Sequence, residues 1–192
     1  MKIKLAVIFD QRQNVGGGFS QSFEMVKFLN NNANKYYEPI FFTIFKENLI
    51  FFEKEKIKVS FLKINLIQRF LMRLTFYIQN KISKIFFPKI IGISKFESLL
   101  LKRNIDIVYF LSPSSWSLYL NKLNYVITVW DLCHKYHPEF PEIRNQNNFE
   151  ERERFLNLSL KKATAIITDS IETKSNLVKS YDVHDDRVCI IE

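Results

Sequence analysis

The sequence contains few of the residues that small proteins use for cross-links and metal sites. Only two cysteines and three histidines occur among its 192 residues. Cys133 and Cys189 alone cannot form a disulfide framework, and a structural zinc site would need Cys/His pairs at both of its ends. We therefore predict no metal and no other cofactor, and stability must come from a hydrophobic core, for which the length suffices.

Long apolar runs are also missing. No stretch of about 18 uncharged apolar residues is present, so we expect no membrane-spanning helix. The first apolar run, 4–9, is too short for the core of a signal peptide. With 47% apolar and 25% charged residues the composition is that of a globular protein, and we expect it in the cytoplasm.

Acidic residues are absent between Glu55 and Glu97. The chain has 28 basic and 20 acidic residues, a formal charge of +8. This window alone carries nine positive charges, so the rest of the chain sums to −1. The nine bases are Lys56, Lys58, Lys63, Arg69, Arg73, Lys81, Lys84, Lys89 and Lys95.

Glycine is scarce, and three of the four glycines are consecutive. Gly16, Gly17 and Gly18 follow an apolar strand and precede a segment with helical spacing. Glycines let the backbone approach an anion closely, and a helix N-terminus adds partial positive charge. The spacing matches neither a P-loop nor G-x-G-x-x-G, so the loop is either a ligand loop or only a flexible turn.

Apolar strands alternate with helical patterns along the whole chain. Such alternation predicts an α/β fold, a doubly wound parallel sheet in a single Rossmann-like domain. The expected strands are 4–9, 38–45, 59–64, 105–111, 125–129, 165–168 and 187–191. The expected helices follow the glycines and cover 67–86, 94–102, 149–161 and 171–179.

The stretch from Thr128 to Glu142 places polar and aromatic residues directly after a strand, where open α/β sheets bind ligands. Pro138 and Pro141 should keep it from forming helix. Asp131 can bind sugar hydroxyls or cap a following turn. His134 is a candidate acceptor contact or a solvated histidine, and too few neighbours are suitable for a metal.

Two further segments leave alternatives open. Ser170, after the strand 165–168, can cap the next helix, whose N-terminus can also receive an anion. In the basic window, Ile67, Leu71, Leu74, Ile78, Ile82 and Ile85 recur at helical spacing, with Arg69, Arg73, Lys81 and Lys84 off that stripe. This helix is either a core helix with a basic solvated face, a helix that docks on anionic lipid, or a nucleic-acid surface, for which no motif is present.

The glycine loop, the Trp130-Asp131 strand end, His137-Pro138 and Ser170 together resemble family-four (group 1) retaining glycosyltransferases. In that family His-Asp is common where this chain has Trp130-Asp131. The resemblance implies the acceptor-side, N-terminal domain of the two-domain GT-B fold. It covers residues 1–192, and the donor-binding domain is expected to lie beyond them.

The resemblance implies transfer of a sugar, with retention, from a nucleotide sugar to a polysaccharide, a lipopolysaccharide or another lipid-linked acceptor. It makes Asp131 the candidate catalytic residue. The implied substrate-binding residues are Gly16, Gly17, Gly18, Trp130, His134 and Ser170. It also favours contact of Arg69, Arg73, Lys81 and Lys84 with an anionic membrane, peripherally at the inner face of the plasma membrane, and no nucleic acid.

The chain alone is expected to show no sugar transfer, because the donor machinery of the resembled family lies in the second domain. The alternative is a stand-alone, non-catalytic module. It would bind the acceptor, or recruit a separate donor-domain chain to the membrane, and act together with that chain.

Overall fold

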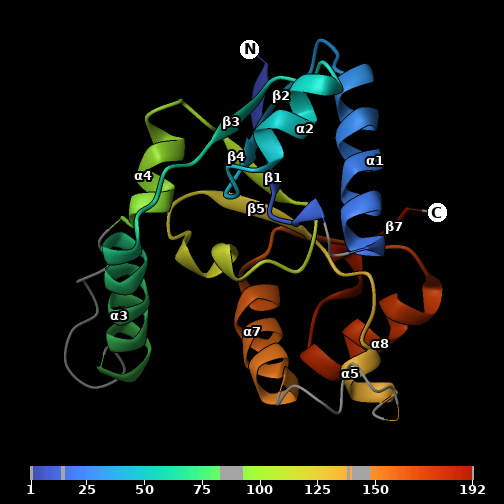
Figure 1. The fold of residues 1–192 in the computed structure, drawn as a ribbon. Helices are drawn as coiled ribbons and strands as arrows, with labels where there is room; N and C mark the ends of the chain where they lie inside the picture. The colour runs from blue at the N-terminus through green and yellow to red at the C-terminus, as the bar shows by residue number, and fades with distance from the viewer. Residues whose placement is uncertain (1, 14–15, 83–92, 138, 140–147, 192) are drawn as a thin grey trace.

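The computed structural model describes residues 2–13, 16–82, 93–137, 139 and 148–191. This part of the chain forms one seven-stranded parallel sheet with the strand order β3-β2-β1-β4-β5-β6-β7 (Figure 1). The strands are β1 (Ile3–Phe9), β2 (Tyr37–Thr43), β3 (Val59–Phe61), β4 (Ile107–Phe110), β5 (Asn124–Thr128), β6 (Ala165–Thr168) and β7 (Val188–Ile190). The predicted fold class is confirmed.

The centre of the sheet is β1, which pairs with β2 along one edge and with β4 along the other. Its residues 6–9 are fully buried. Strands covered on both faces need a continuous apolar run rather than an alternating one, which is what this segment has. After β1 the chain crosses one face of the sheet to reach β2. On the other side of β1, β4 begins the second half of the sheet.

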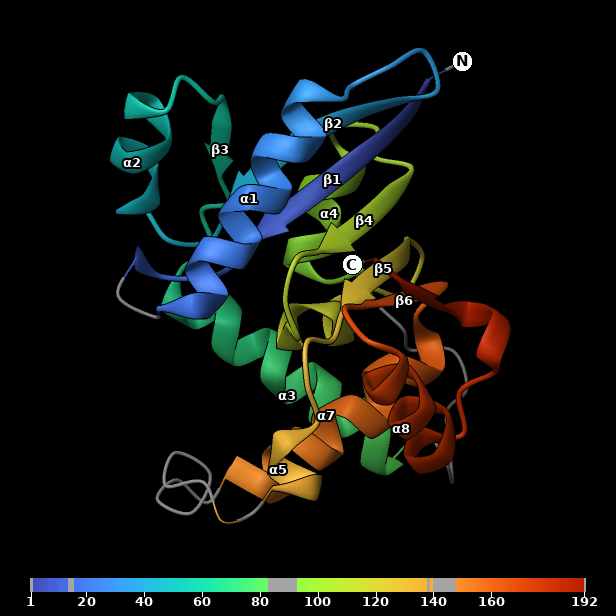
Figure 2. The same cartoon turned by 90° about the vertical axis from the view of Figure 1, so that its right-hand side faces the viewer.

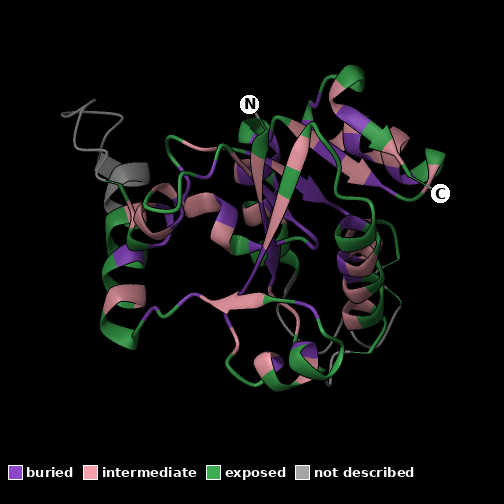
Figure 3. Ribbon diagram, turned by 90° about the horizontal axis from the view of Figure 1, so that it is seen from above, coloured by how far each residue is buried: buried purple, intermediate pink, exposed green. Residues whose placement is uncertain are grey.

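Helices lie on both faces of the sheet (Figure 2). On one face, α1 (Gly17–Asn31) and α2 (Asn48–Lys54) pack against β1 and β2. The other face carries α3 (Leu66–Ile82), α4 (Lys95–Leu101), the 3₁₀ turn η2 (Ser115–Tyr119), α7 (Asn148–Lys162) and α8 (Ile171–Tyr181). Figure 3 shows the buried residues concentrated in the strands at the centre and exposed residues on the outer sides of the helices.

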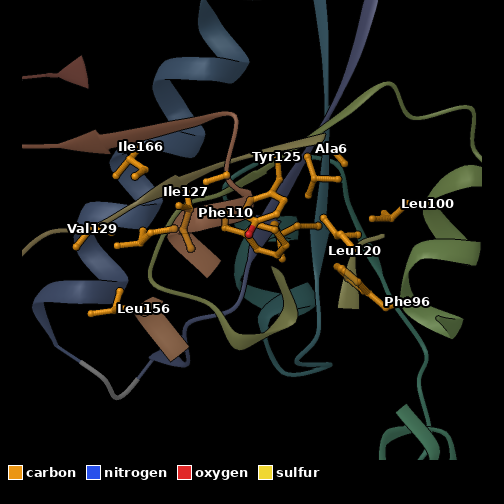
Figure 4. Packing of buried hydrophobic residues seen from close by; sticks show 14 of the residues in the cluster. Ala6, Phe96, Leu100, Phe110, Leu120, Tyr125, Ile127, Val129, Leu156 and Ile166 are labelled. Atoms are coloured by element: carbon orange, nitrogen blue, oxygen red, sulfur yellow. The ribbon is translucent and has the colours of Figure 1, made fainter. Parts of the chain in front are cut away.

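The larger core cluster lies between the sheet and this second layer (Figure 4). Phe110 and Tyr125 meet edge to face, with ring centroids 5.7 Å apart. The Tyr125 hydroxyl donates to the Ser159 carbonyl oxygen at 2.5 Å, which joins β5 to α7. Burial raises the pKa of Tyr125 to about 12, so this hydrogen-bond donor stays protonated at neutral pH.

Among the α-helices in the described part of the chain, α2 and α5 (Cys133–Tyr136) were not predicted. Asn48, the first residue of α2, is fully buried, and its amide donates to the Gln11 carbonyl oxygen at 2.8 Å. The short helix α5 lies in the stretch predicted to avoid helix. That prediction was wrong for one helical turn, because Pro138 excludes helix only near its own position and α5 ends before it.

Candidate functional site

The carboxyl ends of β1, β4, β5 and β6 meet at one edge of the sheet. The connection after β1 leads to α1 on one face, and the connection after β4 leads to η2 on the other. The boundary between β1 and β4 is therefore the switch point at which open α/β sheets form a ligand crevice. Residues just after these strands are the first candidates for ligand contacts.

The glycine loop forms the start of α1. Gly16 has φ +72°, and its carbonyl oxygen accepts hydrogen bonds from the amides of Phe19 and Ser20. No side chain of the described residues caps α1, and its first turn contains no acidic residue. The amides at a helix start lack partners within the helix, so this end suits an anion or a hydroxyl oxygen.

The structure brings the glycine loop and Trp130 into contact. A Cβ atom built on Gly18 would lie 2.9 Å from Cζ3 of Trp130 and 3.1 Å from its Cη2. The same Cβ would lie 3.5 Å from Oε1 of Gln11. At Gly17, by contrast, a Cβ would have no described atom within 4 Å. Gly18 thus packs against the indole, whereas Gly17 faces open space.

A groove of about 800 Å³ lies beside α1, over the half of this sheet face that α1 and α2 leave free. Its wall on the sheet side includes Tyr109, Leu111, Thr128, Trp130, Ile167 and Asp169. The Tyr109 hydroxyl lies 2.9 Å from Oγ1 of Thr128. The groove is mostly apolar with a few polar groups, as small-molecule sites generally are.

Asp131 follows the groove-lining Trp130 in the chain, is exposed and also serves a local structural role. Its Oδ1 accepts a hydrogen bond from the Cys133 amide at 2.9 Å, at the start of α5. Burial raises the pKa of the Cys133 thiol, and the charge of Asp131 adds to that rise. Asp131 therefore makes the capping interaction, and its exposed carboxylate can bind sugar hydroxyls at the same time.

His134 does not lie with this group. It is only 2% exposed, and its Nε2 lies 2.8 Å from Oε1 of Glu153 on α7. Tyr181 of α8 donates to the same carboxylate oxygen, and Nζ of Lys135 lies 3.1 Å from Oε2. The solvated alternative for His134 is wrong. Its contacts support anchoring of α5 on α7 and α8, and an acceptor contact stays a prediction.

Glu153 is the centre of this cluster, and the sequence did not reveal it. Burial raises the pKa of Glu153, but hydrogen bonds from Tyr181, His134 and Lys135 outweigh that effect and lower it below 4.5. A group with a lowered folded-state pKa stabilises the fold above its unfolded-state pKa, and this stability is lost as the pH falls through the folded-state value.

We expect Glu153→Gln to reduce the free energy of unfolding at pH 7 by about 1–3 kcal/mol, because charged hydrogen bonds are replaced by neutral ones. The difference from the wild type should shrink below about pH 4.5, near the unfolded-state pKa. Urea unfolding at pH 7 and pH 4 measures both effects. Glu151→Gln, at an exposed site on the same helix, is the control and should be neutral. An equal loss at both pH values would contradict the assignment.

Ser170 caps α8, one of the two alternatives open for it. Its Oγ accepts a hydrogen bond from the Thr173 amide at 3.1 Å. The capping role is compatible with an anion at the same helix end, so substrate contact stays a prediction.

Asp10 and Ser112, which follow β1 and β4, were not predicted as site residues. Asp10 comes just after the apolar strand β1, as Asp131 comes just after β5. An acidic residue at a strand end is a signal that the sequence already contained.

The basic helix α3 does not bury the described part of its predicted apolar stripe, as the core-helix alternative would require. Ile67, Leu71 and Leu74 of the predicted stripe are 70%, 52% and 42% exposed. The helix instead packs inward through Met72, which is 6% exposed, and through Phe76, whose ring meets Tyr119 edge to face. These three stripe residues thus form an uncovered surface, and the core-helix alternative is wrong for this described part of the stripe.

The predicted membrane-contact residues are only partly visible. Arg73 is exposed, whereas the guanidinium of Arg69 lies over the Trp116 ring, 5.5 Å from its centroid. Lys84 and Ile85 lie outside the described residues, and the side chains of Ile78, Lys81 and Ile82 are not described either. No helix in the described segments is long and apolar enough to cross a membrane. The same segments hold no cluster of three metal-ligating side chains.

No protein-family model matches this chain, and no curated protein matches it either. Solved structures do share its fold. A glycosyltransferase from Rickettsia africae ESF-5 superposes over 100% of this chain with a TM-score of 0.54 at 17% identity. A putative UDP-N-acetylglucosamine 2-epimerase from Listeria monocytogenes superposes over 98% with a TM-score of 0.54 at 14% identity. The chain spans 43% and 44% of the length of those two proteins.

Proposed function

We propose that this chain is the acceptor-side domain of a retaining glycosyltransferase of the GT-B type, which moves a sugar from a nucleotide sugar to a glycan or lipid-linked acceptor. The observation that carries the proposal is the contact between the Gly16–Gly18 loop and Trp130 beside the groove at the sheet's carboxyl edge. The fold shared with a glycosyltransferase from Rickettsia africae ESF-5 supports it.

In this proposal each part of the site has a chemical task. The amides at the start of α1 face an anionic or hydroxyl oxygen of the substrates. The indole of Trp130 offers a flat apolar surface for a sugar ring, and Asp131 offers carboxylate oxygens to its hydroxyls. The donor half of the reaction belongs to a second Rossmann-like domain, as the greater length of both solved proteins suggests.

The two tryptophans of the chain allow a direct test of acceptor binding. Trp116 packs on Phe96 and Tyr119, so Trp116→Phe keeps an aromatic ring there and leaves Trp130 as the single tryptophan. Titration with methyl glucoside, methyl mannoside, methyl galactoside and N-acetylglucosamine should change the Trp130 fluorescence in a saturable way for at least one sugar. An unchanged signal with all four would count against the proposed function.

For Asp131→Asn we expect a loss of ~10²-fold in sugar transfer by an enzyme that also contains the donor-binding domain, or about 2.7 kcal/mol of transition-state stabilisation. Asparagine retains an oxygen that can accept from the Cys133 amide, so the free energy of unfolding should change by under about 1 kcal/mol. Steady-state rates and thermal melts measure the two effects. Full activity, or an unfolded domain, would leave only the capping role. His134→Ala should cost less activity.

Membrane attachment is the second part of the proposal. The exposed face of α3 carries Leu66, Ile67, Phe70, Leu71, Leu74 and Tyr77, which are 42–81% exposed. At 100° per residue they span an arc of roughly 140°, and Arg73 borders it. An amphipathic helix with an apolar arc and neighbouring bases lies in the interface of an anionic bilayer. This placement would bring the domain to lipid-linked acceptors.

A further inference from the structure

Asp10 occupies the switch point of the sheet, directly after β1. The Ser112 hydroxyl, which follows β4, donates to its Oδ1 at 2.5 Å. A hydrogen bond from Ser114 also reaches the carboxylate. The Asp10 side chain thus bridges the ends of the two strands between which the crevice of an open α/β sheet forms.

The charge of Asp10 is not required by these contacts. No basic side chain of the described segments forms an ion pair with it: Arg12, two residues away, pairs with Glu47. Burial raises the pKa of Asp10, although the serine hydrogen bonds oppose that rise. A desolvated carboxylate without a cation costs stability, and asparagine could accept the same serine hydrogen bonds. A carboxylate kept at such a cost at the switch point of an open α/β sheet is typical of a functional site.

The neighbours of Asp10 belong to the candidate site. Gln11, the next residue, points its Oε1 toward Gly18, which in turn packs against Trp130. Asp10 therefore begins the connection whose end, Gly16 to Gly18, belongs to the predicted acceptor surface. A carboxylate can accept about four hydrogen bonds, so the two serines and the Asp10 backbone amide still leave capacity for a ligand.

We propose that Asp10 is a substrate-binding residue whose carboxylate accepts hydrogen bonds from hydroxyl groups of the acceptor sugar. This inference rests on the glycosyltransferase function proposed above. It assigns to the switch point a recognition role distinct from that of Asp131, which lies after β5. The ligand class is a neutral polyol, because an anionic group would be repelled by the unpaired carboxylate.

The first test is stability as a function of pH. A group with a raised folded-state pKa destabilises the fold once the pH exceeds its unfolded-state pKa, 3.8 for Asp10. Asp10→Asn should therefore raise Tm at pH 7, and the difference should disappear below about pH 3.8. A lower Tm at pH 7 would mean that the carboxylate is structural, and it would overturn the proposal.

The matched control is Asp106→Asn, at the amino ends of the same two strands, β1 and β4. Asp106 accepts a hydrogen bond from the Lys4 amide at 2.7 Å and is exposed. Its contact is structural, so this variant should not gain stability at pH 7, and it should bind sugars as the wild type does.

The second test measures sugar binding through Trp130 in the Trp116→Phe chain, with the four sugars named above. Asp10→Asn should weaken the binding of the responding sugar at least tenfold. Unchanged affinity with a functional wild type would overturn the role of Asp10 alone. If the wild type binds none of the sugars, the proposed function loses its support, and the inference is rejected with it.

Discussion

Replacing Gly17 by valine should reduce sugar transfer ~10²-fold or more, about 2.7 kcal/mol of transition-state stabilisation, without loss of thermal stability. A Cβ at this position meets no described atom within 4 Å, so the new side chain fits the free domain. It would occupy the space that we propose for a substrate oxygen at the start of α1. Steady-state kcat/KM and thermal melts of the enzyme with its donor-binding domain measure the two properties.

Gly18→Ala is the informative comparison, because its methyl group would lie within 3.1 Å of two Trp130 ring atoms. That variant should move the indole and change the Trp130 fluorescence even without sugar, whereas Gly17→Val should not. Full activity of Gly17→Val would show that no substrate group enters this space. A large drop in its Tm would show that the position serves the fold.

The second large effect concerns the outer face of α3. Replacing Ile67, Phe70 and Leu74 by serine removes about 1.5 kcal/mol of apolar burial for each residue and should weaken binding to anionic vesicles by roughly 10³-fold. Arg73→Glu should weaken it about tenfold or more at low salt and have less effect at high salt, where surface charges are screened. Vesicle co-sedimentation with anionic and neutral lipid measures both contributions.

Arg73 is preferable to Arg69 for this test, since Arg69 lies over Trp116 and its loss would also disturb packing. Ile171, an isolated apolar residue that is 72% exposed at the start of α8, provides the control: Ile171→Ser should leave vesicle binding unchanged. If the wild type binds neutral and anionic vesicles equally, or binds neither, the membrane proposal is wrong.

The strands could be predicted because burial on both faces leaves a direct mark on the sequence. The strand Ala165–Thr168 was predicted with the bounds that the structure shows, and the other six differ by one to three residues at their ends. The helix α2 escaped because Leu49, Ile50, Phe51 and Phe52 are consecutive and show no helical period. Its position is set by the buried amide of Asn48, a tertiary contact.

The geometry of the candidate site could be predicted only where it is local in sequence. Residues after a strand could be placed at the sheet edge, and the glycine loop at a helix start. The bonds of Glu153 join three helices over separations of up to 28 residues, and no pattern in the sequence indicates them. Periodicity likewise showed that one face of α3 is apolar, but not that the helix packs through Met72 and leaves that face uncovered.

The position of β1 has a consequence for how the chain folds. Its pairing with β4 joins residues about a hundred positions apart: the bond from the Lys4 amide to Asp106 spans 102 residues. Closing so long a loop costs chain entropy before the sheet gains the pairing, and folds rich in such distant contacts form slowly. During synthesis, β1 therefore waits with one edge unpaired until about residue 110 has emerged, and a waiting edge strand of apolar residues can pair with another chain. Correct assembly of the domain depends on keeping that edge apart from other nascent chains until β4 arrives.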